Sequence, residues 1–480
     1  MVISDVKGEL YDYTYAYLKR LGYDVIAIDF KAPLKSNQYN FLQPVIDAVN
    51  NGDLAEAEAH TKDIVNSLVP DTKTGEPIWR NGEASVMGGA IMSVVFDNKE
   101  RPQYQNLTNV YNFINYMFKA DGKGVSPIDR YIQKFSDENP IKAVFGTAIN
   151  AHFRTRSSFI SAALSTLQHF ISPNIYHMTH KSDFNLHDVG KKKQAIFIIL
   201  PYDRTTYHGL ASLFVNQQYV ALAASAERWG GRLQNRVNFI LDEFGNFTKI
   251  PAFTNMLTVG GGAGLRFNLV VQSFSQIEKI YGKEDMQTIS GNCHCLVYLH
   301  SEDGNTNAEI SKRLGKYTTS SYSRSQSISK KNANSSNSIN LIGRELLTPD
   351  EVSKIRRPYL LALYSGRSPA LLELPDISQW RFNAMLGMGD IQHNLKLRHK
   401  RQQMRASKPL EPIQLWGVWK QYQGGQLADM IPDPAEYSEG MFDAGADDFA
   451  YIEEETAIDE VADEMFGADE ERKDDIDKYE

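Results

Sequence analysis

Cysteine is nearly absent, since the chain has only Cys293 and Cys295. Two cysteines are too few for a disulfide framework, and two positions this close in one strand are poorly placed to bridge, so we expect a reducing compartment. Long apolar runs are also missing. None approaches the about eighteen residues needed to cross a bilayer, and the opening MVISDVKGEL lacks the basic start and apolar centre of a signal peptide. The chain as given is therefore expected to be cytoplasmic.

The sequence contains no phosphate-binding loop of the G-x-x-x-x-G-K-[ST] type. Such a loop supplies the backbone N–H groups and the lysine that hold nucleotide phosphates. The glycine run GGGAG at residues 260–264 follows a predicted helix and precedes a predicted strand, which is the reverse of the order that a phosphate loop needs. We interpret it as a tight helix-to-strand connection. Either the chain does not hydrolyse nucleotide, or its phosphate loop has been lost from the front.

Other catalytic and metal-binding patterns are scarce. No G-x-S-x-G elbow for Ser-His-Asp catalysis occurs. Cys293, His294 and Cys295 bring three metal-capable groups together, but His294 would point away from both cysteines in an extended strand, and no second cysteine pair completes a tetrahedral zinc site. We expect strand packing there.

Charge is divided unevenly along the 480 residues. Residues 431–480 hold 20 acidic and 3 basic residues, whereas residues 1–430 hold 39 acidic and 48 basic residues. Like charges repel and few apolar residues are present in the tail, so we predict an acidic disordered tail that binds a basic protein partner. The mildly basic body is compatible with a polyanion, although a solvated surface explains it equally well.

Hydrophobic patterning predicts an α/β fold. Strand patterns at residues 1–4 and 25–29 flank a helical pattern at 10–21, which is a parallel crossover unit. Strand patterns resume at 195–200, 237–241, 267–271 and 295–300, with helices between them. Residues between 104 and 185 have helical patterns throughout. We therefore predict a mostly parallel sheet flanked by helices, with an inserted all-α domain.

The patterns also predict boundaries. Residues 318–340, rich in Ser and Asn, predict a mobile loop, and residues 359–364 and 370–374 predict a β-hairpin that finishes the sheet. The predicted units are 1–103, the first part of a nucleotide-binding α/β domain; 104–185, the all-α domain; 186–380, the second part of the α/β domain; 381–430, a basic linker with helical segments; and the tail at 431–480.

The most informative segment is VNFILDEFGNF at residues 237–247. An apolar strand delivers Asp242 and Glu243 to its carboxyl end, which is the form of a Walker B element. In that reading Asp242 associates with Mg²⁺ and Glu243 polarises water. A strand end with a capping acid has the same local sequence, so the motif alone leaves both readings open.

Gln272 is the next candidate. It follows the predicted strand at 267–271, and ligands of open α/β sheets bind beyond the strand carboxyl ends, where a polar side chain can sense a γ-phosphate. Helix capping is the alternative role. Arg266, Arg313 and Arg344 are candidates for an arginine that reaches a neighbouring subunit's phosphate, and each is also a plausible surface residue.

Eight segments in chain order carry a resemblance to a known family: SDVKGEL at 4–10, GYDV at 22–25, SNQYN at 36–40, FILDEFGNF at 239–247 with IP at 250–251, VVQSFSQIEKIYG at 270–282, ISGNCHCLVYL at 289–299, ISKRLG at 310–315 and LLTP at 346–349. Over roughly residues 1–375 the chain resembles the TraG/TraD-type coupling proteins of type IV secretion and conjugation, hexameric ATPases related to the FtsK and HerA translocases.

The resemblance implies a RecA-like motor with the all-α domain inserted. It also implies that ATP and Mg²⁺ are bound if upstream sequence supplies a P-loop, with Asp242 as the Mg²⁺-associated acid, Glu243 as the catalytic base and Gln272 as the sensor. Asp5 and Lys7 of the D-x-K-G-E segment are implied on the cofactor-binding side. One departure is the glycine run before Arg266, where the family leads us to expect a more polar, arginine-bearing turn.

In this family the P-loop and membrane-spanning helices precede the D-x-K-G-E segment, so we expect a chain that lacks its front. The implied function is to bring DNA with its relaxase and accessory proteins to a type IV secretion channel and to drive transfer with ATP. The intact form is expected to be a homo-hexamer at the cytoplasmic face of the membrane. The alternatives are a non-catalytic interaction module or truncated remnant, and a coupling ATPase for protein effectors.

Overall fold

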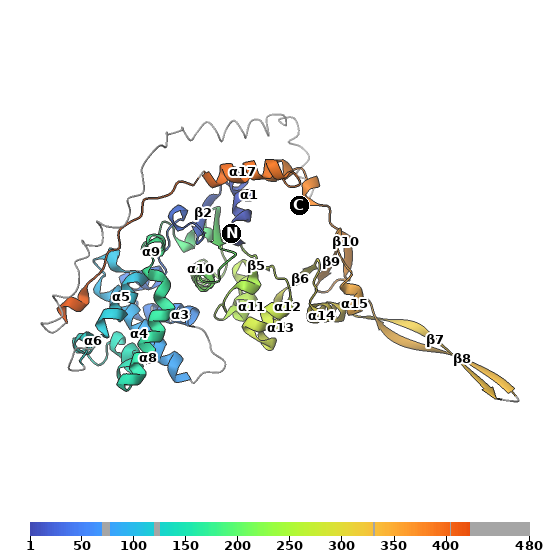
Figure 1. The fold of residues 1–480 in the computed structure, drawn as a ribbon, viewed down its shortest axis with the longest axis horizontal. Helices are drawn as coiled ribbons and strands as arrows, with labels where there is room; N and C mark the ends of the chain where they lie inside the picture. The colour runs from blue at the N-terminus through green and yellow to red at the C-terminus, as the bar shows by residue number, and fades with distance from the viewer. Residues whose placement is uncertain (70–76, 120–124, 330–331, 404, 423–480) are drawn as a thin grey trace. The chain divides into compact units, whose positions relative to one another are not determined.

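The computed structural model describes residues 1–69, 77–119, 125–329, 332–403 and 405–422 (Figure 1). Five parallel strands form its main sheet. Their order is β2-β3-β1-β4-β5, and all four pairings are parallel. β3 is buried along its whole length because its sequence QAIFIIL is apolar almost throughout, as strands covered on both faces are. The five strands are β1 (Val2–Val6), β2 (Asp24–Asp29), β3 (Gln194–Leu200), β4 (Val237–Leu241) and β5 (Leu265–Leu269). The predicted parallel sheet is confirmed.

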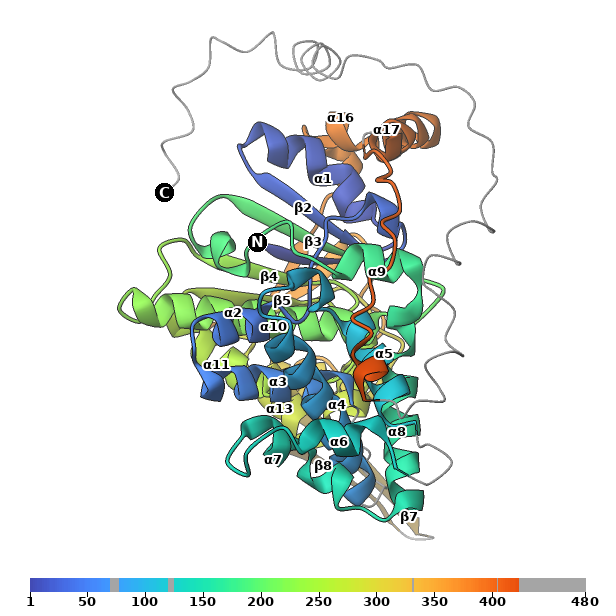
Figure 2. The same ribbon diagram turned by 90° about the vertical axis from the view of Figure 1, so that its left-hand side faces the viewer.

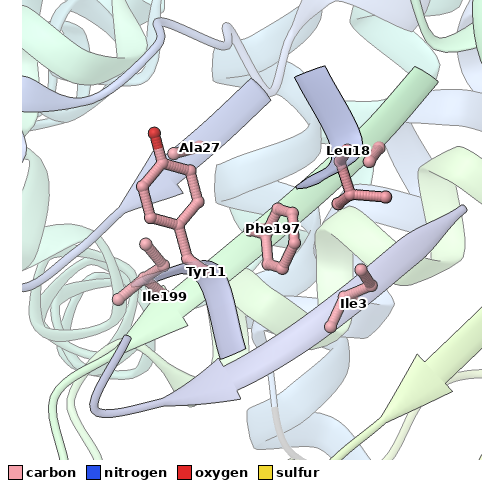
Figure 3. Packing of buried hydrophobic residues seen from close by; sticks show 7 residues of the cluster. Ile3, Tyr11, Leu18, Ala27, Phe197 and Ile199 are labelled. Atoms are coloured by element: carbon pink, nitrogen blue, oxygen red, sulfur yellow. The ribbon is translucent and has the colours of Figure 1, made fainter. Parts of the chain in front are cut away.

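Helix α1 (Glu9–Arg20) covers one face of the β1, β2 and β3 strands. Tyr11 and Leu18 of α1 pack with Ile3, Phe197 and other sheet residues in one buried cluster (Figure 3). The ring of Tyr11 meets the edge of Phe197 at a centroid distance of 5.3 Å. This cluster joins the first crossover unit to β3, which lies about 170 residues later in the sequence.

Helices α10 (His208–Arg228) and α11 (Phe253–Ala263) lie on the opposite side of the sheet from α1 (Figure 2). Phe239 of β4 stacks on Phe267 of β5 at 4.7 Å, and Phe253 of α11 meets Phe267 edge-on at 5.6 Å. Gly264 ends α11 with φ at 90°, a conformation that favours glycine, and β5 begins at the next residue. The glycine run is therefore the helix-to-strand connection that the sequence predicts.

The all-α part is built around α4 (Pro77–Asp97), whose central residues are almost all buried. Gly82 and Gly89 allow close approach, since a Cβ at either position would overlap the ring of Phe159 or Phe145. Residues 43–68, which have a continuous helical pattern, form two helices with a turn between them. The surrounding helices are α2 (Gln43–Asn50), α3 (Leu54–Leu68), α5 (Leu107–Met117), α6 (Pro127–Ile132), α7 (Pro140–Ile149), α8 (Phe153–Leu167) and α9 (Pro173–Thr179).

A second sheet contains β10, β9 and β6 in that order. β6 (Cys295–Tyr298) pairs antiparallel with β9 (Tyr359–Tyr364), and β9 pairs with β10 (Ala370–Glu373). The predicted hairpin is confirmed, but it and β6 form a separate sheet rather than finishing the parallel one. Four helices accompany this region: α12 (Phe274–Tyr281), α13 (Lys283–Asn292), α14 (Gly304–Leu314) and α15 (Pro349–Val352).

The Ser- and Asn-rich segment is not a loop, contrary to the prediction. β7 (Lys316–Ser329) and β8 (Asn332–Glu345) form a two-stranded antiparallel ribbon. Small polar residues satisfy their backbone hydrogen bonds by pairing across strands, which needs no apolar face of the kind that sequence patterns detect.

Residues 405–422, which we call the strap, run from the parallel sheet to the all-α part. Arg405 pairs with Asp29 of β2 at 2.7 Å, and further along Trp416 stacks on Phe113 and Trp419 on Tyr116. The strap follows α16 (Asn383–Leu386) and α17 (Ile391–Gln403). Within the described residues no helix combines the length and apolar character needed to cross a membrane. The predicted acidic tail at 431–480 lies outside the described residues.

Candidate functional site

Asp242 and Glu243 follow β4 directly, at the carboxyl edge of the parallel sheet. The hydroxyl of Ser4, fully buried in the neighbouring β1, donates a hydrogen bond to the carbonyl oxygen of Asp242 at 2.8 Å. Burial raises the pKa of the Asp242 carboxyl, and the neighbouring negative charge of Glu243 raises it further. A nearby divalent cation would oppose both effects, because it favours the ionised carboxylate.

Glu243 has a left-handed backbone, with φ at 50°. A non-glycine residue in this region costs on the order of 1 kcal/mol, and such strain clusters at functional sites. Lys7, Glu243 and Ala252 are the non-glycine residues with positive φ in the described chain, and the first two come just after the carboxyl ends of β1 and β4. The strain is therefore concentrated at the edge where ligands of parallel sheets bind.

Gln272 contacts Glu243. Its side-chain amide donates to the two carboxylate oxygens of Glu243 at 3.3 and 3.2 Å, and its backbone N–H donates to the side-chain oxygen of Gln276 at 3.2 Å. β5 ends at Leu269, two residues before the predicted end, so Gln272 lies on the connection to α12. The structure thus brings the predicted base and the predicted sensor into direct contact.

Buried aromatic rings hold the turn after Glu243 in place. Phe244 is fully buried, and its ring lies 4.9 Å from that of Phe253 and 5.9 Å from that of Tyr281. The hydroxyl of Tyr281 accepts a hydrogen bond from the backbone N–H of Ile250 at 3.1 Å. The carboxylate of Glu243 therefore projects from an anchored turn, which limits the entropy lost when it orients a ligand.

Asp5 and Lys7 lie near this edge but differ in environment. The Asp5 carboxylate is buried and accepts hydrogen bonds from the backbone N–H of Gly8 at 3.1 Å and of Tyr11 at 2.7 Å, so it caps the start of α1. Burial raises the pKa of Asp5 to about 6, against the lowering effect of these hydrogen bonds. Lys7 is exposed, with its ammonium group 5.9 Å from the centre of the Tyr202 ring. Only Lys7 of the two is free to turn toward a ligand.

The three candidate arginines have distinct surroundings. Arg266 is exposed on β5 and forms no ion pair with another described residue. Arg313 pairs with Glu309 at 2.9 Å and donates to the Ser290 hydroxyl. Arg344 pairs with Glu351 at 2.6 Å. A role for Arg313 or Arg344 toward another subunit would require breaking these contacts.

Sequence reasoning missed the residues that connect Gln272 to β6. The Ser301 hydroxyl donates to the carbonyl oxygen of Gln272 at 3.1 Å, and the Ser275 hydroxyl contacts both carboxylate oxygens of Asp303 at 3.1 and 3.0 Å. The available signal was that a polar segment follows each of the strand patterns at 267–271 and 295–300, which the sequence predicts to lie in one parallel sheet with their carboxyl ends at one edge. Among the described residues there is no group of three or more His, Cys, Asp or Glu side chains placed to hold a metal ion, and Cys293 and Cys295 are free thiols.

The fold and the site together define a RecA-like α/β protein with an inserted all-α domain and an acidic pair at the carboxyl edge of its sheet. Residues 1–374 match the family described as "Type IV secretory system Conjugative DNA transfer". The chain belongs to this family of conjugative coupling proteins, as the sequence resemblance predicts.

Two curated relatives illustrate the extent of the similarity. Protein VirD4 of Rhizobium radiobacter is 30% identical over 202 residues, covering 42% of this chain and 29% of VirD4. Conjugal transfer protein TraG of Escherichia coli is 24% identical over 377 residues, covering 74% of this chain and 58% of TraG. The chain therefore matches less than two thirds of the length of either relative.

Solved structures of the bacterial conjugative coupling protein TrwB share the fold. The unbound form of TrwB gives a TM-score of 0.55 at 17% identity, covering 78% of this chain and 77% of the TrwB chain. TrwB in complex with ADP and Mg²⁺ also gives 0.55 at 17% identity, covering 78% of each chain. This likeness establishes the RecA-like fold of the present chain.

Proposed function

We propose that this chain is the motor part of a conjugative coupling protein, which links a relaxase–DNA complex to a type IV secretion channel and drives DNA transfer with ATP. The contact between Gln272 and Glu243 at the carboxyl edge is the observation that carries the proposal. Family membership supports the link to DNA transfer, and the TrwB complexes with an ATP analogue and with ADP and Mg²⁺ support the nucleotide.

The oxygen-rich acidic pair suits Mg²⁺, which prefers carboxylate and water ligands and usually keeps several of its waters. In the proposal Asp242 holds the ion through water. Mg²⁺, when bound, would neutralise charge on the phosphates. Glu243 orients and deprotonates the attacking water, and Gln272 keeps the Glu243 carboxylate in place and senses the nucleotide state. No phosphate loop occurs in the 480 residues, so the proposal requires this loop from additional polypeptide.

The proposed partners follow from family and charge. The intact protein would assemble as a homo-hexamer at the membrane. There it would bind DNA with its relaxase and accessory proteins, and the proteins of the secretion channel. Lys7 is an exposed cation just after β1, at the carboxyl edge, and can approach phosphate there, whereas Arg266 is exposed near the amino end of β5 and would serve only toward a neighbouring subunit's phosphate. The acidic sequence at 431–480 would recruit a basic protein.

The test is ATPase activity with and without DNA, measured on residues 1–480 and on a protein extended upstream so that a phosphate loop is included. In the active form, Glu243→Gln should lower the rate by about 10²–10⁴-fold, the usual contribution of a general base. Glu284→Gln is the matched control, because Glu284 is an exposed glutamate in the first turn of α13.

Gln272→Ala should reduce the rate while leaving nucleotide affinity nearly unchanged, since Gln272 acts through Glu243. Absence of ATPase activity from both proteins would refute the enzymatic role. In that case relaxase binding without nucleotide dependence would support an interaction module. A salt series of DNA binding separates DNA from protein cargo, because phosphate contacts weaken steeply as salt rises.

A further inference from the structure

The second half of the strap lies on the all-α part as an extended segment (Figure 2). Residues 409–417 contain no helix or strand, and one short turn, η7 (Val418–Gln421), follows them. Among the described residues, no backbone-to-backbone hydrogen bond joins residues 409–416 to another part of the chain. This segment is therefore held by side chains of the helices beneath it, as a peptide bound in a groove is.

Asn109 of α5 holds the strap by its backbone. The buried side-chain amide of Asn109 donates to the carbonyl oxygen of Gln414 at 3.0 Å and accepts from the backbone N–H of Trp416 at 3.0 Å. The hydroxyl of Tyr176 in α9 accepts from the backbone N–H of Gln414 at 3.2 Å. These contacts use only peptide groups of the strap, so an extended peptide of another sequence can make them too.

Arg130 of α6 makes a further contact of this kind. Its guanidinium donates to the carbonyl oxygen of Tyr422 at 2.6 Å, and the ring of Tyr422 lies edge-on to that of Tyr131 at a centroid distance of 5.5 Å. A hydrogen bond from a charged donor is stronger than one between neutral groups. The backbone contacts thus extend from Gln414 to Tyr422 and fix the direction of the bound segment.

Aromatic stacking adds a requirement on the sequence of the ligand. The ring of Trp416 stacks on Phe113 with centroids 5.9 Å apart, and the ring of Trp419 stacks on Tyr116 at 4.3 Å. Phe113 and Tyr116 are three residues apart on α5, which places them on one face of that helix. The surface therefore selects aromatic residues at two positions that are three apart.

The fit of Trp419 is incomplete. Its side chain is buried, and the indole N–H has no hydrogen-bond partner among the described residues. A buried donor without a partner loses the hydrogen bond that it makes to water in the free state, and this weakens binding. A ligand with a phenyl ring at this position would avoid that cost.

Six side chains from α5, α6 and α9 contact this segment, and we call them the strap site: Asn109, Phe113, Tyr116, Arg130, Tyr131 and Tyr176. We propose that the strap site recognises an extended peptide with aromatic residues at two positions three apart. The strap is the resident ligand of this site, and a partner peptide of the same chemistry displaces it. This inference goes beyond the proposed function and holds whether or not the chain hydrolyses ATP. Because Arg405 of the strap also pairs with Asp29, displacement would loosen the connection between β2 and the all-α part.

The test is binding of a labelled synthetic peptide with the sequence of residues 409–422 and an amidated C-terminus, measured by fluorescence anisotropy. The full chain with Trp416→Ala and Trp419→Ala should bind it at least about tenfold more tightly than the unmodified chain, in which the tethered strap competes at high effective concentration. Adding Asn109→Ala should weaken binding by about tenfold, as expected for two lost hydrogen bonds. Asn115→Ala is the matched control and should have no effect, because Asn115 is exposed on the same helix.

Changes in the peptide test the same contacts with the protein left untouched. N-methylation at Trp416 removes the N–H that donates to Asn109 and should weaken binding at least about tenfold. N-methylation at Leu415 is the control, since this N–H makes no hydrogen bond to a described backbone group. Trp419→Phe in the peptide should keep or raise the affinity, whereas Trp419→Ala should lower it at least about tenfold. The same series on the single variant Trp416→Ala decides the matter if the double variant does not fold.

Hydrogen exchange of the unmodified full chain tests whether the strap detaches by itself. The Trp416 amide should exchange at least about tenfold faster than the amide of the fully buried Ile114 in α5, because it needs only local opening. Equal rates would mean that the strap opens only together with α5, which overturns the inference. Equal peptide binding by the unmodified chain and the double variant also overturns it, as does binding that Asn109→Ala leaves unchanged. Dimers that dissociate when the peptide is added would assign the site to the strap of a second copy and overturn the partner peptide.

Discussion

The ion pair between Arg405 and Asp29 allows a quantitative test of how the strap is held. The guanidinium nitrogen Nη2 lies 2.7 Å from Oδ2 of Asp29, and the side chains are 18% and 2% exposed. The guanidinium also lies 4.5 Å from the centre of the Tyr11 ring. The other oxygen of Asp29 accepts hydrogen bonds from the backbone N–H groups of Lys31 and Ala32 at 2.9 and 3.0 Å. Arg405 thus joins the strap to the core at the β2 edge.

Replacing Arg405 with Ala should lower the free energy of unfolding by about 2–3 kcal/mol. Removing one member of a buried pair usually costs about 3–5 kcal/mol, because the other charge is left buried. The cost here falls below that range for two reasons. Asp29 keeps two backbone donors, and the mutation also removes the burial of two guanidinium nitrogens that have no hydrogen-bond partner. The lost contact with Tyr11 adds about 0.5–1 kcal/mol.

The assay is urea denaturation followed by tryptophan fluorescence, since Trp416 and Trp419 both lie on the strap. Arg357→Ala is the control, because Arg357 pairs with Asp376 at 3.7 Å and is 96% exposed. Its effect should stay within about 0.5 kcal/mol, as for other surface pairs. If Arg405→Ala behaves like this control, the pair does not hold the strap and the reasoning is refuted.

Two further predictions concern the site and its support. Burial raises the pKa of Asp5 from 3.8 to about 6, so the folded state binds the Asp5 proton more tightly than the unfolded state does. This difference contributes about 3 kcal/mol to the free energy of unfolding below about pH 4, and the contribution is lost as the pH rises through about 6. Asp5→Asn should therefore flatten the dependence of the urea midpoint on pH between 4 and 7, and an unchanged slope would contradict this assignment. Phe244→Ala should cost about 3–5 kcal/mol because its ring is fully buried, whereas Phe153→Ala, 63% exposed, should cost less than about 0.5 kcal/mol in the same denaturation assay; equal effects would show that the turn after Glu243 is not anchored by packing.

The order of strands and helices around the site followed from local patterns. The apolar runs of β2, β3 and β4 were recognisable because a strand's composition and its spacing of apolar residues can be seen within a few consecutive residues of the sequence. The Asp242–Glu243 pair was recognisable for the same reason, since it interrupts an apolar strand. Gln272 was predicted at a strand end, and the contact with Glu243 agrees with that position although β5 ends earlier.

Other features depended on residues far apart in sequence. The β7–β8 ribbon was interpreted as a loop because its residues are small and polar, and their pairing is visible only when both strands are present. β6 has the sequence of an inner strand but pairs with β9 instead of β5, which no local pattern reports. The division of the chain into five units and the catalytic, cofactor and arginine roles remain predictions.

The sequence by itself determined the class of fold, the family and the acidic pair that ends β4, because alternation, turn residues and motif spacing are properties of short segments. The tertiary structure decided which strands are neighbours, which edges stay open and that Asp5, near the carboxyl end of β1, caps α1. The physical reason is that strand pairing and burial depend on contacts across the chain. The residues next to one another in sequence set the apolar pattern of a segment. The residues that contact that segment from elsewhere in the chain set its strand partners and its burial.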